Sequence, residues 1–169
     1  MDTGYIFRPA GMADTGRIME IIGQAKAQMK REGRDQWDEN YPAERDISGD
    51  ILSSSGYVLV SGELPVAYGA AVFSGEPAYS AIRGKWLSDL DYVVLHRLAV
   101  ADEVKGRGVA TVFMRKVEEL AACRGIRSFK VDTRYDNIPM LKVFTRLGFS
   151  YCGEVRYGHG ARMAFEKLI

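Results

Sequence analysis

The sequence of 169 residues contains little cysteine and almost no excess of charge of either sign. Two cysteines, Cys123 and Cys152, are too few for a disulfide framework or for a metal site of their own. We therefore expect two reduced, buried thiols in a cytoplasmic protein. The 23 Lys and Arg residues against 22 Asp and Glu residues give a net charge of +1, which argues against a general nucleic-acid binder.

Long apolar runs and targeting patterns are missing as well. No stretch of 18 apolar residues occurs, so we expect no membrane-spanning segment. Residues 1–9 lack the basic start and apolar stretch of a secretory signal. With 47% apolar and 27% charged residues, the composition is that of a globular protein, and its length predicts one domain over residues 1–169.

Hydrophobic periodicity predicts alternating strands and helices. Helices are expected from Asp14, as a cap, to Gly33, and at 43–53, 109–121 and 138–147. Strands are expected at 5–9, 57–60, 66–73, 92–100, 128–132, 149–155 and 162–166. This order predicts an α/β fold with a single mixed, partly antiparallel sheet of six or seven strands and helices on both faces. The strands at 92–100 and 128–132 should be joined by a parallel crossover.

The most informative segment joins a strand end to a helix through two glycines, Gly106 and Gly108. Glycines let backbone N–H groups converge, and the first helical turn adds unpaired donors, so we expect a phosphate or pyrophosphate site. A Walker-type loop does not fit, because Val109 follows where Lys should stand. A dinucleotide fingerprint, with Asp132 as its acid, remains a weak alternative and would imply a nucleotide-dependent oxidoreductase.

A third pattern fits better. Lys105-Gly106-Arg107-Gly108-Val109-Ala110 resembles the Arg/Gln-x-x-Gly-x-Gly/Ala loop of the Gcn5-related N-acetyltransferases (GNAT), although Lys stands where that family usually has Arg or Gln. Asn137-Ile138-Pro139-Met140 and Leu147-Gly148-Phe149 resemble the fourth helix of the family and its exit. The predicted element order resembles that fold over the whole chain. The resemblance implies an acyl-CoA N-acyltransferase fold, with acetyl-coenzyme A as co-substrate and direct transfer to a primary amine.

The resemblance also implies roles for individual positions. The strand end lines the pantetheine arm, the loop amides hold the pyrophosphate, and the fourth helix adds further contacts. These cofactor-binding residues are Leu98, Ala99, Val100, Lys105, Gly106, Arg107, Gly108, Val109, Ala110, Thr111, Asn137 and Met140. One departure is Phe144, where the family often has a Tyr that protonates the leaving thiolate; Phe cannot donate a proton.

Amine attack on a thioester calls for a proton acceptor and an oxyanion donor. The candidates for the acceptor are Asp132, at the end of its strand, His96, whose ordinary pKa suits neutral pH, and Tyr92, on the same strand face as His96. The period of two places His96 on the same strand face as Val100, whose amide is the candidate oxyanion donor. Each side chain could equally be structural, through capping, a salt bridge or a hydrogen bond.

For the acceptor, three aromatic residues, Trp37, Tyr41 and Trp86, lie in connections expected to flank the site. With nearby acids they could hold a cationic amine, or they could simply anchor the loops. The expected partner is a small-molecule or peptide amine, with no nucleic acid, membrane or metal. A non-catalytic acyl-coenzyme A sensor stays open because of Phe144. Proteins of this fold often pair exposed strands into a homodimer, but the sequence leaves the oligomeric state open.

Overall fold

The computed structural model describes residues 4–169, which divide into two compact units. The first unit extends to Ala71 and includes His96–Lys116; the second comprises Val72–Leu95 and Val117–Ile169. Strand β5 (Tyr92–Val100) and helix α3 (Val109–Cys123) contribute residues to both. The expectation of one domain over residues 1–169 stays a prediction.

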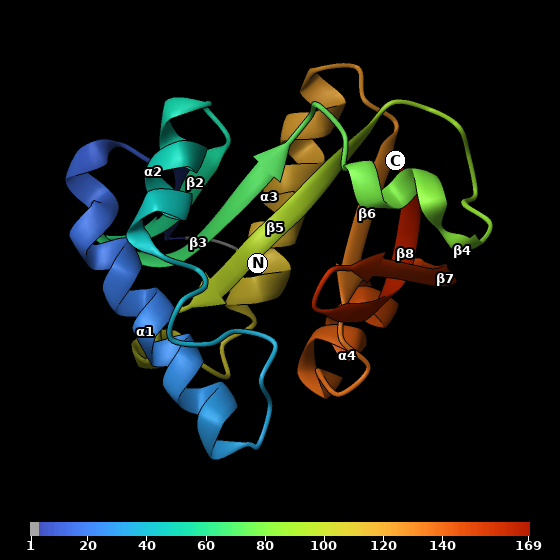
Figure 1. The fold of residues 1–169 in the computed structure, drawn as a ribbon. Helices are drawn as coiled ribbons and strands as arrows, with labels where there is room; N and C mark the ends of the chain where they lie inside the picture. The colour runs from blue at the N-terminus through green and yellow to red at the C-terminus, as the bar shows by residue number, and fades with distance from the viewer. Residues whose placement is uncertain (1–3) are drawn as a thin grey trace. The chain divides into compact units, whose positions relative to one another are not determined.

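The strands form one mixed sheet in the order β1-β2-β3-β5-β6-β8-β7-β4 (Figure 1). Strands β5 and β6 pair in parallel over Tyr92–Val94 and Ser128–Lys130, as predicted. The mixed α/β fold is thus confirmed, with an eighth strand, β4, that is too short to show any alternation in the sequence. The remaining strands are β1 (Tyr5–Pro9), β2 (Gly56–Ser61), β3 (Leu64–Val72), β4 (Arg83–Gly84), β6 (Ser128–Thr133), β7 (Ser150–Tyr157) and β8 (Gly160–Leu168).

In the first unit, helices α1 (Thr15–Arg31) and α2 (Glu44–Leu52) lie in front of the strands of this unit, on the side toward the viewer in Figure 1. The apolar side chains of α1 recur at helical spacing and are buried, which explains why this segment forms an amphipathic helix. Phe7 of β1 stacks on Tyr57 and meets Phe113 of α3 edge-on, at ring distances of 4.9 and 5.3 Å. These rings form part of the core of the first unit.

The second unit is built on β6, β8 and β7 with helix α4 (Ile138–Leu147). Gly148 ends α4 in the left-handed region, at φ 89°, as its sequence position predicts. Four rings of this unit pack together at centroid distances of 5.1 to 5.7 Å: Phe129, Phe144, Phe149 and Phe165. The apolar face of helix α4 therefore packs against apolar side chains of the sheet, as its hydrophobic periodicity predicts.

The two cysteines differ in environment. Cys152 is buried, as expected, and burial raises the pKa of its thiol. Cys123 is exposed, so the expectation of a buried thiol is wrong at this position. It lies two residues beyond Ala121, the last buried residue of the apolar stripe of α3. Among residues 4–169, no helix combines the length and the apolar character that a bilayer crossing requires.

The expected cap of α1 is also different. The Asp14 side chain makes no capping hydrogen bond to α1. It accepts instead from Gly11 N at 2.8 Å and from the Arg8 guanidinium at 2.8 and 2.9 Å. The hydrogen bonds from Arg8, and then that from Gly11, outweigh burial and lower the pKa of Asp14. The carboxylate thus fastens the short 3-10 turn Met12–Asp14 to β1 rather than capping the helix.

This contact predicts a pH-dependent stability. Because the pKa of Asp14 is depressed in the folded chain, its contribution is present at pH 7 and is lost as the pH falls through that value. Asp14→Asn should lower the free energy of unfolding by about 1 kcal/mol at pH 7 and by less at pH 3. Urea unfolding at both pH values measures this, with the exposed Asp89→Asn as control. Equal losses at the two pH values would refute it.

Candidate functional site

The predicted phosphate cradle lies between the 3-10 turn Asp102–Val104 and helix α3. Gly106 and Gly108 both adopt the left-handed region, at φ 78° and 71°. Val112 N donates to Gly108 O at 3.1 Å, so the amides of the first three residues of α3 have no helical acceptor. Within residues 4–169, we find no backbone carbonyl that accepts from the amides of 106–108. Six successive N–H groups, from residue 106 to 111, are therefore available to an anion.

The entrance to this loop is held by helix α1. Gln24 accepts from Asp102 N at 2.9 Å and donates to Glu103 at 3.1 Å. Arg17 pairs with the same Glu103 and donates to Pro65 O at 2.9 Å. These contacts fix the turn before the glycines, so the loop starts from a defined position.

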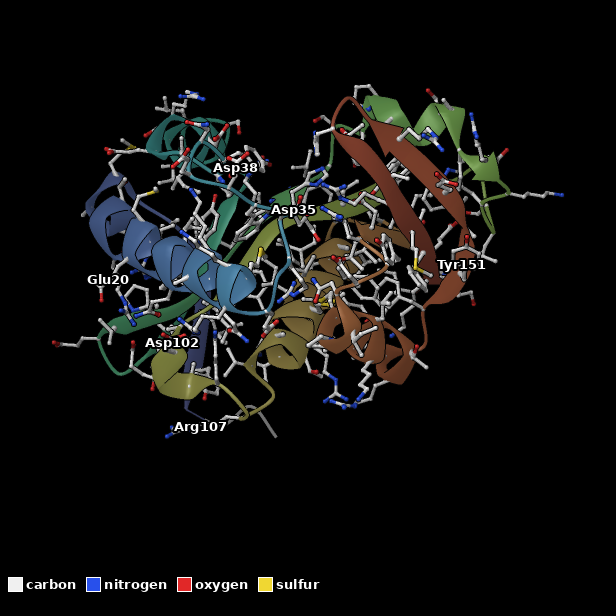
Figure 2. All side chains as sticks on the ribbon, turned by 60° about the horizontal axis from the view of Figure 1, so that its bottom comes forward. Glu20, Asp35, Asp38, Asp102, Arg107 and Tyr151 are labelled. Carbon is white, nitrogen blue, oxygen red and sulfur yellow. The ribbon has the colours of Figure 1, made fainter. Side chains whose placement is uncertain are left out.

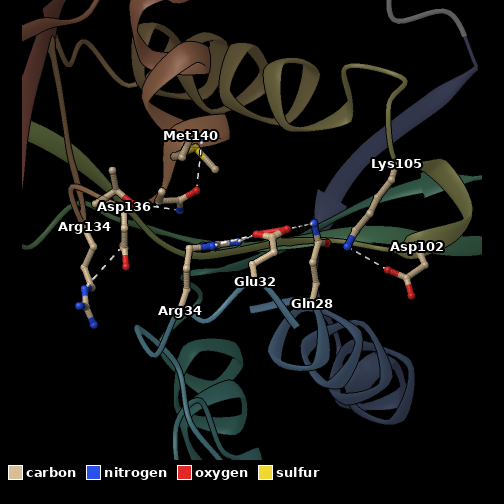
Figure 3. A network of polar contacts seen from close by, with 10 residues as sticks. Gln28, Glu32, Arg34, Asp102, Lys105, Arg134, Asp136 and Met140 are labelled. Atoms are coloured by element: carbon tan, nitrogen blue, oxygen red, sulfur yellow. Dashed lines mark hydrogen bonds and ion pairs between the residues drawn. The ribbon is translucent and has the colours of Figure 1, made fainter. Parts of the chain in front are cut away.

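The two basic residues of the loop behave differently. Lys105 pairs with Asp102 at 2.9 Å, as Figure 3 shows. Arg107 is exposed at the tip of the loop (Figure 2). Lys105 is thus engaged with a carboxylate of the chain, whereas Arg107 is exposed to solvent.

The strand before the cradle contains a break that the sequence did not indicate. Arg97 adopts a left-handed backbone, at φ 57°, between His96 and Leu98. The prediction that His96 and Val100 share a face assumed an unbroken period of two, and that period does not continue through such a residue. His96 is half-buried and makes contacts of its own. Ala99 is buried, and Leu98 and Val100 are half-buried.

The predicted acceptor residues Trp37 and Tyr41 lie on the loop between α1 and α2, with Asp35 and Asp38 (Figure 2). Asp38 Oδ1 accepts from the amides of Asn40 and Tyr41, at 2.8 and 3.0 Å, which fixes a tight turn. Trp37 is half-buried, and Tyr41 is 38% exposed. The loop is therefore ordered by its own polar groups while its aromatic side chains remain partly open.

The hydroxyl of Tyr41 belongs to a cluster that sequence reasoning missed. Arg97 Nη1 donates to this hydroxyl at 3.0 Å, and Arg97 Nε and Nη2 donate to the carboxylate of Asp50 in α2. Asp50 also accepts from the Tyr68 hydroxyl of β3. Burial and the neighbouring Asp50 raise the pKa of Tyr68. Burial alone would lower the pKa of Arg97, but the hydrogen bonds and charge of Asp50 keep the pKa of Arg97 above its usual value. The loop before α2, helix α2 and strands β3 and β5 supply these four groups, so no local motif could have shown them.

In the second unit, Asp132 is held by two tyrosines. Its Oδ2 accepts from Tyr79 Oη at 2.6 Å and from Tyr157 Oη at 2.8 Å. Burial, and then the charge of Asp132, raise the pKa of both phenols, so both remain donors. The carboxylate is thus fixed at one oxygen, just beyond the point where pairing of β5 with β6 ends at Lys130.

The third aromatic candidate, Trp86, lies on the connection that follows Tyr79. Its indole N–H donates to Tyr79 O at 2.9 Å. The ammonium of Lys130 lies 4.3 Å from the Trp86 ring and 4.1 Å from that of Tyr92. Burial lowers the pKa of Lys130, against the opposing charge of Glu166. A cation–π contact is therefore present at Trp86, but its cation comes from the chain itself.

The remaining predicted residues lie around α4. Asn137 caps this helix, accepting from Met140 N at 3.4 Å and donating to Thr133 at 3.1 Å. Phe144 is 3% exposed and packs on Phe149 and Phe165. The position at which the resemblance implies a Tyr acid thus lies in the apolar core of the second unit.

The predicted site residues fall into both units. The first unit brings together the cradle, the end of β5 and the loop of Trp37 and Tyr41. The second brings together Asp132, its two tyrosines and Trp86, and separately the α4 residues. Among residues 4–169, no group of three or more His, Cys, Asp or Glu side chains is arranged to hold a metal ion.

Comparisons with known proteins identify the fold and the family of this chain. A GNAT acetyltransferase from Streptococcus agalactiae 2603 is 33% identical, has a TM-score of 0.90, and the match covers 99% of this chain and 96% of that one. The acetyltransferase yncA of Salmonella typhimurium, solved with its cofactor acetyl-CoA, is 13% identical, with a TM-score of 0.70 and coverage of 98% and 94%. The ribosomal-protein-S18-alanine N-acetyltransferase of Escherichia coli is 13% identical, with a TM-score of 0.67 and the same coverage.

At 13% identity, the last two likenesses show the fold alone. No curated protein matched this chain. The model of the Acetyltransferase (GNAT) family matches residues 21–149, which is most of the chain. With its glycine cradle, its mixed sheet and a relative at 33% identity over nearly its whole length, this chain belongs to the GNAT family of acetyltransferases.

Proposed function

We propose that this chain transfers the acetyl group of acetyl-coenzyme A directly to a primary amine, in a ternary complex. The acceptor is a small molecule, an amino acid or a protein N-terminus. The observation that carries the proposal is the run of six available amides from residue 106 to 111, at the positive end of α3. The acetyl-CoA in the yncA structure and the alanine acceptor in the name of the E. coli enzyme support it.

In this proposal acetyl-coenzyme A supplies an activated thioester, and the chain supplies binding and proton transfer. Backbone groups of Leu98, Ala99 and Val100 line the pantetheine arm, and the Val100 amide stabilises the oxyanion. Asp132 or His96 accepts the proton of the amine. An alkyl ammonium of pKa about 10.4 is roughly one part in a thousand free base at pH 7, a cost of about 4–5 kcal/mol, so this acceptor matters most.

A proton donor for the leaving thiolate matters less. A thiol of pKa about 8.5 makes protonation worth only about 2 kcal/mol at pH 7. Phe144 therefore does not argue against catalysis, because water can protonate the thiolate. Tyr135, which is 69% exposed, is a second candidate donor.

The test measures binding and turnover separately. Calorimetry with acetyl-coenzyme A and with NAD should show binding of acetyl-coenzyme A alone. Thiol release with a panel of amines, amino acids and N-terminal peptides should then rise above background for one acceptor class. Tight binding of acetyl-coenzyme A without release would favour the acyl-coenzyme A sensor. Binding of NAD would favour the oxidoreductase.

A further inference from the structure

Arg97 holds a backbone conformation that its side chain disfavours. Left-handed φ values are uncommon for residues other than Gly, Asn and Asp, and for a long side chain they persist only where the surroundings enforce them. Ser54, which follows α2, is the other such residue that is not glycine in the described chain, 4–169. Arg97, by contrast, lies inside strand β5, directly before Leu98. Something must therefore fix Arg97 against this local preference.

The side chain of Arg97 supplies that fixation. Its Nε donates to Asp50 Oδ2 at 2.9 Å and its Nη2 donates to Asp50 Oδ1, which is a bidentate pair. Asp50 is 6% exposed, so the pair is screened little by water. The hydroxyl of Tyr68 donates a further hydrogen bond to Asp50. The carboxylate thus accepts three hydrogen bonds, and the bidentate pair fixes the orientation of the guanidinium.

In that orientation, Arg97 Nη1 faces the loop between α1 and α2 that carries Trp37 and Tyr41. Nη1 donates to Tyr41 Oη at 3.0 Å, and the Tyr41 amide is itself held by Asp38. Trp37 lies one residue before Asp38 on the same loop. One side chain therefore joins the loop of Trp37 to the strand residue that precedes Leu98, and all of these groups lie in the first unit.

We propose that Arg97 is a positioning residue that couples the 37–41 loop to the cofactor-binding end of β5. A ligand that pairs with the backbone of Leu98–Val100 changes the geometry of β5 next to Arg97, and the guanidinium transmits that change to Tyr41. Occupation by acetyl-coenzyme A thereby prepares the loop that receives the amine. This inference rests on the proposed function, because it requires acetyl-coenzyme A to bind along β5.

Fluorine NMR tests the coupling without a known acceptor. The chain has two tryptophans, Trp37 and Trp86, so 5-fluorotryptophan labelling gives two resonances, which Trp37→Phe assigns. Titration with acetyl-coenzyme A should shift the Trp37 resonance in the wild-type chain. Tyr41→Phe should abolish that shift, while the Kd for acetyl-coenzyme A by calorimetry changes less than threefold. This variant deletes one hydroxyl and leaves the buried charge pair intact.

Tyr68→Phe is the matched control. It deletes the other hydroxyl of the cluster, so the midpoint of thermal unfolding should fall, but the Trp37 shift should persist because Arg97 still reaches Tyr41. A shift that survives in Tyr41→Phe would overturn the coupling. So would a wild-type Trp37 resonance that does not move although acetyl-coenzyme A binds, and that result would leave the proposed function standing. Absence of binding would overturn both.

Discussion

Replacing Gly108 by valine should weaken acetyl-coenzyme A binding about 30- to 100-fold. The backbone of Gly108 lies at φ 71°, which a β-branched residue adopts at a cost of about 2–3 kcal/mol. A Cβ at this position meets nothing within 4 Å, so the cost lies in the backbone and not in a clash. The loop can relax to negative φ, but the backbone N–H groups around residue 108 then change direction. Since about 1.4 kcal/mol is tenfold in Kd, calorimetry measures the loss directly.

Gly62 offers a matched control in the same unit. It lies in the turn between β2 and β3 at φ 63°, again with nothing within 4 Å of an added Cβ. Gly62→Val should lower the midpoint of thermal unfolding but keep the wild-type Kd for acetyl-coenzyme A. If Gly108→Val also keeps that Kd, the 106–111 amides do not hold the pyrophosphate.

The second large effect concerns the proton of the amine. Asp132→Asn should lower turnover about 100-fold at pH 7 and less than about tenfold at pH 9. The pH difference follows because an amine of pKa about 10.4 is about 100-fold richer in free base at pH 9. Asparagine can keep the hydrogen bonds from both tyrosines through its carbonyl oxygen. An amide NH2 then replaces the second carboxylate oxygen, and this group cannot accept a proton. Rates are measured by thiol release with the best acceptor of the panel.

Asp136→Asn is the control for Asp132→Asn. Asp136 lies in the second unit, four residues further on, and faces Arg134 at 3.7 Å (Figure 3). Its substitution should leave the ratio of rates at the two pH values unchanged. A drop for Asp132→Asn that is the same at pH 7 and pH 9 would assign Asp132 a structural role and leave His96 as the proton acceptor.

The features that the sequence predicted are those that short segments encode. The helix α4 is an example, since Asn137 begins it, its apolar spacing runs to Leu147, and Gly148 ends it within a dozen residues. The cradle is another, because the glycines and the first turn of α3 are adjacent in sequence. Such features depend on local backbone geometry, so they can be predicted without knowledge of tertiary contacts.

The missed features depend on residues that only folding brings together. Asp50, Tyr68 and Arg97 come from α2, β3 and β5, and each alone reads as an ordinary surface or core residue. The break at Arg97 was invisible for the same reason, since no glycine marks it. Asp132 was identified by its place at a strand end, but the tyrosines that hold it come from 53 and 25 residues away.

The position of β8 has a consequence for biosynthesis. Strand β8 is made after β6 and β7, yet it pairs between them, with β6 on one side and β7 on the other. Until residues 160–168 emerge from the ribosome, β6 has an open edge that can pair with other chains. The sheet of the second unit must therefore close after translation of this strand, and a nascent chain stalled before it would be prone to aggregate.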